Sequence, residues 1–149
     1  MIAFVAAGGG FLLAVLWFDL MFDVQAIGHD SDELPEEVLA SIAGYYRRVT
    51  TAARPMNRLI AVMMLATVVS IVVEIGNGDT AGWVAWTSLA LGAGAILTAG
   101  LRTVPSAVSL GARQESSIRQ TALARSILHQ HVGCAMAITA MLILQLASS

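Results

Sequence analysis

Residues 17–25, WFDLMFDVQ, close the first long apolar run of the chain and carry two carboxylates, Asp19 and Asp23. The run starts at Ile2 and reaches the length of about 20 residues that a helix needs to cross the hydrocarbon core of a bilayer. An acidic side chain in or at the edge of a membrane span costs free energy and usually has a function. This stretch therefore indicates a membrane fold and marks the first candidate site.

The composition supports a membrane protein. Of 149 residues, 57% are hydrophobic and 12% are charged, whereas soluble domains carry about 25% charged residues. We expect one integral membrane domain over 1–149. The first run lacks the basic segment of a signal peptide, so we expect it to be a retained span. The single cysteine, Cys134, excludes an intrachain disulfide.

Four apolar runs predict an all-α bundle of four transmembrane helices, with spans at about 2–22, 56–75, 83–101 and 130–147. The last run, Val132–Ala147, is short, but nothing except Gly133 interrupts helical residues from Ile118 to Leu146. Ser116 or Ser117 can cap this long helix. Val104-Pro105 is expected to end the third span.

All eight basic residues are arginines, and they fall in or beside the segments 29–55 and 102–129. The positive-inside rule places these two loops in the cytoplasm and both termini outside. Between spans one and two, Pro35 and the acidic residues after it predict a helix start. Val38, Ile42, Tyr45 and Tyr46 follow helical spacing, which predicts a cytoplasmic interfacial amphipathic helix with its tyrosines at the lipid headgroups.

Small residues on spans one and three predict close helix packing. Ala6, Gly10 and Ala14 recur every four residues on span one, and span three is rich in glycine and alanine. These faces suit packing within the chain, other membrane subunits or a homo-oligomer. Glu74, at the outer end of span two, is expected to be interfacial and solvated.

The two aspartates share a helix face at positions i and i+4, and three polar residues of span two reach the same depth. We expect Asp19 and Asp23 to face Arg54, Asn57 and Arg58. Such a network can be a structural pin between helices. Alternatively it forms a proton or cation site, or the polar lip of a ligand cavity.

The histidines, His29, His129 and His131, lie near the same boundary. His129 and His131 point about 200° apart on a helix and cannot share one metal ion, so no metal site is predicted, and His29 and His131 remain the weakest ligand candidates. His129 completes a candidate polar site with the five residues of the preceding paragraph. Arginines confined to membrane-proximal loops do not suit nucleic acid.

Three segments resemble the anthrone-oxygenase-like group of small four-span bacterial membrane proteins. They are Arg54-Pro55-Met56-Asn57-Arg58-Leu59, Thr103-Val104-Pro105, and Leu123-Ala124-Arg125 through His129. The resemblance implies the bacterial cytoplasmic membrane and a cofactor-poor pocket for a hydrophobic molecule.

Two classes of function remain open from the sequence. One is an accessory or assembly subunit, or a binder of a hydrophobic ligand, with a bound lipid or quinone and no other cofactor. The other is a small oxygenase-like enzyme with a polar pocket facing the cytoplasm. A dimeric transporter or channel ranks third.

Overall fold

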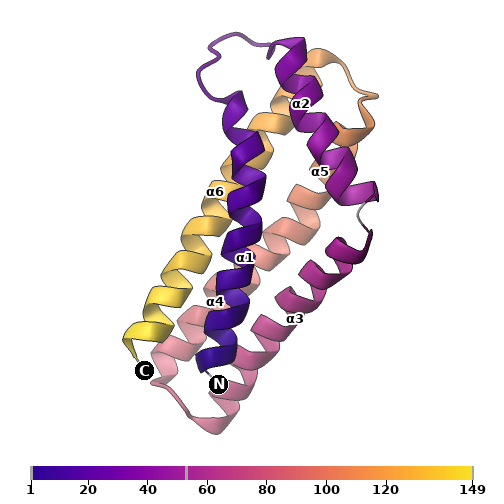
Figure 1. Ribbon diagram of the computed structural model, residues 1–149. Helices are drawn as coiled ribbons and strands as arrows, with labels where there is room; N and C mark the ends of the chain where they lie inside the picture. Colours follow the sequence, from indigo (N-terminus) through magenta and orange to yellow (C-terminus); the bar gives the residue numbers. More distant parts are fainter. Residues whose placement is uncertain (1, 53, 149) are drawn as a thin grey trace.

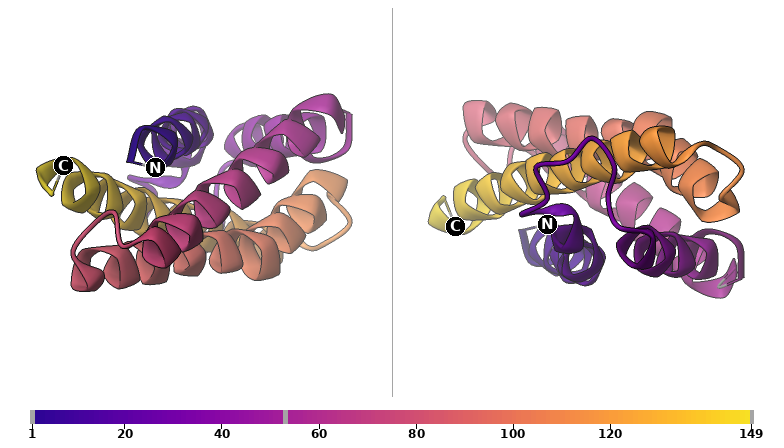
Figure 2. Two further views of the ribbon diagram at one scale, coloured as in Figure 1. Left: turned by 90° about the horizontal axis from the view of Figure 1, so that it is seen from below. Right: turned by 90° about the horizontal axis from the view of Figure 1, so that it is seen from above.

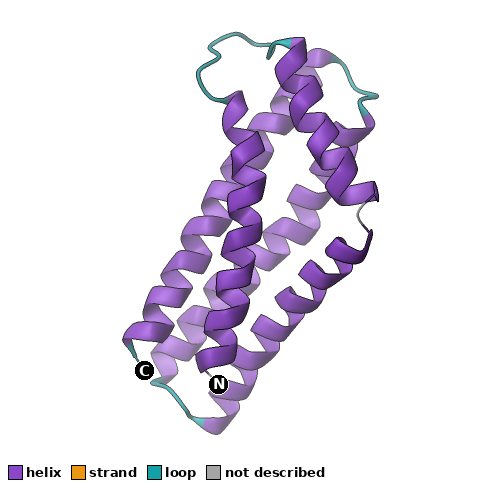
Figure 3. Ribbon diagram, viewed as in Figure 1, coloured by secondary structure: helices purple, strands orange, loops and turns teal. Residues whose placement is uncertain are grey.

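The chain folds as an all-helical bundle, as predicted. The structure is a computed structural model that describes residues 2–52 and 54–148, with the backbone alone at Arg54. Figure 3 shows helices joined by short loops, and the described residues contain no strand. The main helices are α1 (Ile2–Asp23), α2 (Glu36–Arg47), α3 (Arg54–Asn77), α4 (Gly82–Thr98), α5 (Val104–Ala112) and α6 (Ser117–Ala147).

Four helical segments are long and apolar enough to cross a membrane, which confirms the four-span prediction. They are Ile2–Ala26, Pro55–Asn77, Gly82–Ala112 and Ser117–Ala147. The chain termini lie together at one end of the bundle, and α2 lies at the other end (Figure 1). Helix α6 packs against both α1 and α4, and α3 packs against the same two helices (Figures 1 and 2).

The spans approach closely near the termini because α1 carries glycines there. A Cβ at Gly8 would overlap the side chain of Thr67 on α3, and one at Gly9 would lie 2.8 Å from Leu142 Cδ2 on α6. Gly10 and Ala14 are exposed. The close-packed face of α1 therefore differs from the predicted Ala6, Gly10 and Ala14 stripe.

Helix α2 does not present its apolar face for lipid, contrary to the interfacial prediction. Leu39 and Ile42 are fully buried, and α2 packs against α5 and α6 (Figure 1). Tyr46 is 2% exposed, so its predicted place among the headgroups is wrong. The amphipathic pattern was right, but the partner of the apolar face is protein.

The third span continues past Pro105, where the sequence predicted its end. A π-helical turn, Ala99–Thr103, joins α4 to α5, and Val104 N–H bonds to Ala99 O, five residues back. Such a turn shifts the hydrogen-bonding pattern and so accommodates a proline that cannot donate. The predicted cap is confirmed at Ser116, whose side chain accepts from Arg119 N, and α6 runs unbroken through Gly133.

Candidate functional site

The two aspartates of α1 meet adjacent tyrosines from the last turn of α2. Tyr45 Oη donates to Asp19 Oδ1 at 2.6 Å, and Tyr46 Oη donates to Asp23 Oδ1 at 2.6 Å. The ring of Tyr45 also stacks on Phe22, with centroids 4.0 Å apart. Each carboxylate is thereby held by a hydroxyl from the helix that follows it in the chain.

His131 of α6 lies between the two carboxylates. Its Nδ1 is 2.6 Å from Asp23 Oδ2, and its Nε2 is 3.8 Å from Asp19 Oδ2. The Asp23 side chain is fully buried and that of His131 is 7% exposed. We call Asp19, Asp23, Tyr45, Tyr46 and His131 the Asp–Tyr–His cluster. It ties α1 and α2 to α6, which lies far from both in the sequence.

The two tyrosines act as hydrogen-bond donors because they remain protonated. Burial raises the pKa of Tyr45 well above its ordinary value, and the hydrogen bond to Asp19 adds to the rise. Burial likewise raises the pKa of Tyr46, with the charge of Asp23 as the next contribution. Both hydroxyls therefore keep their protons at physiological pH, and each can satisfy a carboxylate oxygen.

Of the span-two residues that the sequence placed opposite the aspartates, the structure describes the side chains of Asn57 and Arg58, and neither bonds to an aspartate. Arg58 is exposed, and the described residues include no ion pair between it and either aspartate. Asn57 Nδ2 donates to Thr50 O at 3.0 Å. The side chain of Arg54 lies outside the described residues. The expected pairing of Arg58 with the aspartates is not found among the described residues, and the partners that the structure gives these carboxylates are Tyr45, Tyr46 and His131.

The three histidines take different positions, and His131 alone joins the cluster. His129 is exposed on α6, with Nδ1 2.7 Å from Arg125 O. His29 lies in the loop before α2, where its carbonyl accepts from Arg125 Nη2 at 2.7 Å. Across residues 2–52 and 54–148, no three or more His, Cys, Asp or Glu side chains are grouped so that they could hold a metal ion.

A cavity of about 670 Å³ adjoins the cluster. It lies among the six main helices and the π-helical turns Arg48–Ala52 and Ala99–Thr103, and its walls are mainly apolar. Phe11, Val15, Ile60, Met64 and Ile138 are among the apolar wall residues. Asp19, Tyr45, Tyr46, Asn57 and His131 are among its polar lining residues. The arrangement is a lipophilic chamber with one polar region.

The cavity reaches the side of the bundle beside the first half of α3, since the buried residues of this helix lie in its second half. Thr67 abuts Gly8 of α1, and Ile71 contacts Gly92 of α4. The first half of α3 lines the cavity instead, and exposed Met56 and Ala61 form part of that lining. On α1, Ala14 and Phe18 line the cavity and are also exposed. Exposed Gly100 and Val104, on the segment after α4, also line the cavity, so the cavity reaches the surface among segments with the length and hydropathy of membrane spans.

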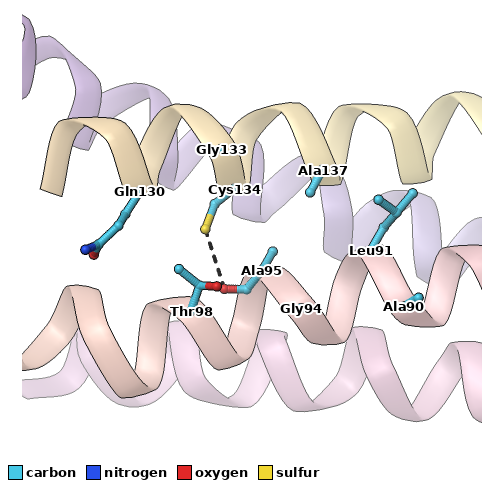
Figure 4. Close-up of a pocket in the computed structure, with 9 residues that line it drawn as sticks. All are labelled: Ala90, Leu91, Gly94, Ala95, Thr98, Gln130, Gly133, Cys134 and Ala137. Carbon is cyan, nitrogen blue, oxygen red and sulfur yellow. Dashed lines mark hydrogen bonds between the residues drawn. The ribbon is translucent and has the colours of Figure 1, made fainter. Parts of the chain in front are cut away.

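A second hollow, of about 290 Å³, lies between α4 and α6 (Figure 4). Small residues line it, among them Ala90, Gly94, Gly133 and Ala137. Cys134 Sγ donates to Ala95 O at 3.5 Å across the two helices, as the dashed line in Figure 4 marks. Its lining contains no charged residue, and it is less than half the size of the cavity beside the cluster.

Glu74, predicted to be solvated, is fully buried instead. Thr80 Oγ1 donates to Glu74 Oε1, and with its amide nitrogen facing Glu74, Gln145 donates to both carboxylate oxygens at 3.2 Å. In the same orientation the Gln145 amide oxygen accepts from Ser88 Oγ at 3.1 Å. Donors from the loop between α3 and α4 and from α6 thus replace the water expected around this acid, and Ser88 of α4 supports Gln145.

Sequence reasoning selected the two aspartates but placed His129 beside them, whereas the structure places His131 there, and it missed the tyrosines as their partners. The signal was present, because Tyr45 and Tyr46 are adjacent polar aromatics on a face that also carries buried Ile42. Comparisons of the chain with protein-family models, curated proteins and solved structures gave no match. The resemblance to the anthrone-oxygenase-like group stays a prediction. Function is therefore inferred from the cluster and the cavity.

Proposed function

We propose that this protein binds a hydrophobic molecule of the membrane in the cavity, with the polar head of that molecule against Asp19 and His131. The observation that carries the proposal is the continuity of the chamber of about 670 Å³ with the Asp–Tyr–His cluster. Ligand sites of a few hundred to 1,000 Å³ with apolar walls and a few convergent polar groups are typical of small-molecule binding.

The source of the ligand follows from the sideways opening. A molecule dissolved among lipid chains meets Ala14 and Phe18 of α1 and Met56 and Ala61 of α3 before it meets water. Its apolar body leaves lipid for a similarly apolar wall, so little of the binding free energy comes from the hydrophobic effect. Shape and the polar head then decide which molecule binds.

Native mass spectrometry of the protein extracted from its own membrane tests this proposal. We expect a non-covalent adduct of one small apolar molecule per chain. Ala61→Phe narrows the cavity and should reduce the adduct, whereas Ala66→Phe, an exposed residue of the same helix outside the lining, should leave it unchanged. A wild-type chain that carries no adduct, or equal adducts in both variants, would contradict the proposal.

A second candidate function is a proton-transfer enzyme that uses the same cavity. The favouring observation is the contact of 2.6 Å between His131 Nδ1 and Asp23 Oδ2, with Nε2 left towards Asp19. A carboxylate that fixes one imidazole nitrogen orients the other as a general base. Turnover of the molecule identified by mass spectrometry, abolished by His131→Gln with binding retained, would favour the enzyme.

We further propose that the arginine-bearing end of the bundle faces the cytoplasm of a bacterium, with both termini outside. The support is the confinement of all eight arginines to or beside the two longer connecting segments. A cysteine introduced at Gly78 should react with an impermeant thiol reagent added to intact cells. The native Cys134 is buried and serves as the unreactive background. Reaction only after lysis would reverse the orientation.

A further inference from the structure

The Asp–Tyr–His cluster leaves two hydrogen-bonding atoms unused towards the cavity. Asp23 Oδ1 accepts from Tyr46, and Asp23 Oδ2 contacts His131 Nδ1. Asp19 Oδ1 accepts from Tyr45. Within the described part of the chain, no hydrogen bond engages Asp19 Oδ2 or His131 Nε2. Both residues line the cavity, and the His131 side chain is more than nine-tenths buried.

The separation of these two atoms suits one bridging oxygen. Asp19 Oδ2 and His131 Nε2 are 3.8 Å apart, too far for a hydrogen bond between them. An oxygen atom can approach both at about 2.7–2.9 Å from the cavity side, which is the usual length of hydrogen bonds to charged groups. The carboxylate oxygen can only accept, so the bridging group must donate to it.

We propose that the ligand carries a neutral hydroxyl, as an alcohol or a phenol, that bridges Asp19 and His131. This inference rests on the proposed binding function. A hydroxyl donates one hydrogen bond and accepts others, so it can donate to Asp19 and accept from His131 Nε2 in the form of the imidazole that carries a proton on both ring nitrogens. An ether or an isolated ketone offers no donor to the carboxylate and leaves it unsatisfied at the end of an apolar chamber.

The charges around the site favour a neutral hydroxyl over a head group that is itself charged. A carboxylate or phosphate head would approach two aspartates, and like charges at this range repel in a poorly solvated site. An ammonium head would find the aspartates attractive. However, an ammonium would have to reach the cavity through the apolar surroundings of the spans. Entry of a charge there costs much more free energy than entry of a neutral hydroxyl. The neutral donor is the head group that satisfies both the cluster and the route to it.

Four molecules with the same chain test the head group: 1-dodecanol, dodecyl methyl ether, dodecanoate and dodecylammonium. The purified protein is reconstituted in phosphatidylcholine nanodiscs, each probe is added as a mole fraction of lipid, and bound probe is counted by native mass spectrometry. We expect dodecanol to reach half-saturation at a mole fraction at least tenfold lower than its methyl ether. Dodecanoate should bind weakest.

Two variants test whether the preference for the alcohol over the ether depends on Asp19. In Asp19→Asn the alcohol-to-ether ratio should fall below threefold, whereas Asp30→Asn, an exposed acid in the loop before α2, should retain the wild-type ratio. If Asp19→Asn does not fold, the order of the four probes on the wild-type protein still tests the inference. Equal binding of alcohol and ether, or tightest binding of the ammonium, would overturn the hydroxyl while leaving a binding cavity. No binding of any probe would overturn the proposed function itself.

Discussion

Tyr46→Phe removes one hydroxyl from the buried end of the Asp–Tyr–His cluster and keeps the ring. That hydroxyl donates to Asp23 Oδ1 at 2.6 Å, and Asp23 is fully buried. A hydrogen bond to a charged acceptor contributes roughly 1.5–3 kcal/mol, and water cannot easily replace this donor. We therefore expect the free energy of unfolding to fall by about 1.5–3 kcal/mol.

Tyr45→Phe is the matched control, because the same atom is removed from the neighbouring residue. Tyr45 is half-buried, and the side chain of its partner Asp19 is 16% exposed, whereas that of Asp23 is fully buried. The expected loss is smaller, about 0.5–1.5 kcal/mol. Unfolding is followed by tryptophan fluorescence during titration of the detergent-solubilised protein with dodecyl sulfate. A Tyr46→Phe variant as stable as wild type, or less affected than Tyr45→Phe, would refute the buried network.

Two further predictions concern stability at alkaline pH and the close contact between α1 and α3 at Gly8. Because the pKa values of both tyrosines are raised in the folded state, stability should be complete below about pH 10, the ordinary tyrosine pKa, and fall as the pH rises further. The fall should approach about 1.4 kcal/mol per pH unit for each tyrosine. The chain has no lysine to titrate there, and the double Tyr→Phe variant should show a clearly shallower fall in the same titration. Gly8→Val should lower the melting temperature by several degrees because the new side chain meets Thr67. Gly10→Val is the control and should not lower it, because the space around Gly10 is open. Equal melting temperatures of the two variants would contradict the close contact of α1 with α3.

The presence and order of the four long helices were predictable because the hydropathy of a segment follows directly from its residue types. The same reasoning found the Ser116 cap and the continuity of α6 through Gly133. It failed at Pro105, because a π-helical turn can accommodate a proline that an ordinary helical turn cannot. A proline in a sequence marks a missing donor but does not show how the neighbouring turns adjust.

The candidate site was harder to predict, because depth in a span does not determine rotation about the helix axis. His129 and His131 are two residues apart, yet only His131 contacts the aspartates of α1, and Arg58 is exposed although the sequence placed it at the depth of the aspartates. The docking of α2 on α5 and α6, which carries Tyr45 and Tyr46 to the aspartates, depends on contacts between segments far apart in the chain. Glu74 was misjudged for a similar reason, because Gln145 and Ser88 arrive from other helices.

Photolabelling with a long-chain alcohol that bears a diazirine tests the binding cavity most directly, because α3 has one face towards it and one away. After irradiation in the nanodisc, labelled positions are mapped by peptide mass spectrometry. We predict labelling at Ile60 and Met64, which line the cavity, with excess unlabelled dodecanol suppressing it. Val62 and Leu65, exposed on the other face of the same helix, should show only weak labelling that dodecanol does not suppress. Equal labelling of both faces, insensitive to the competitor, would contradict a binding cavity.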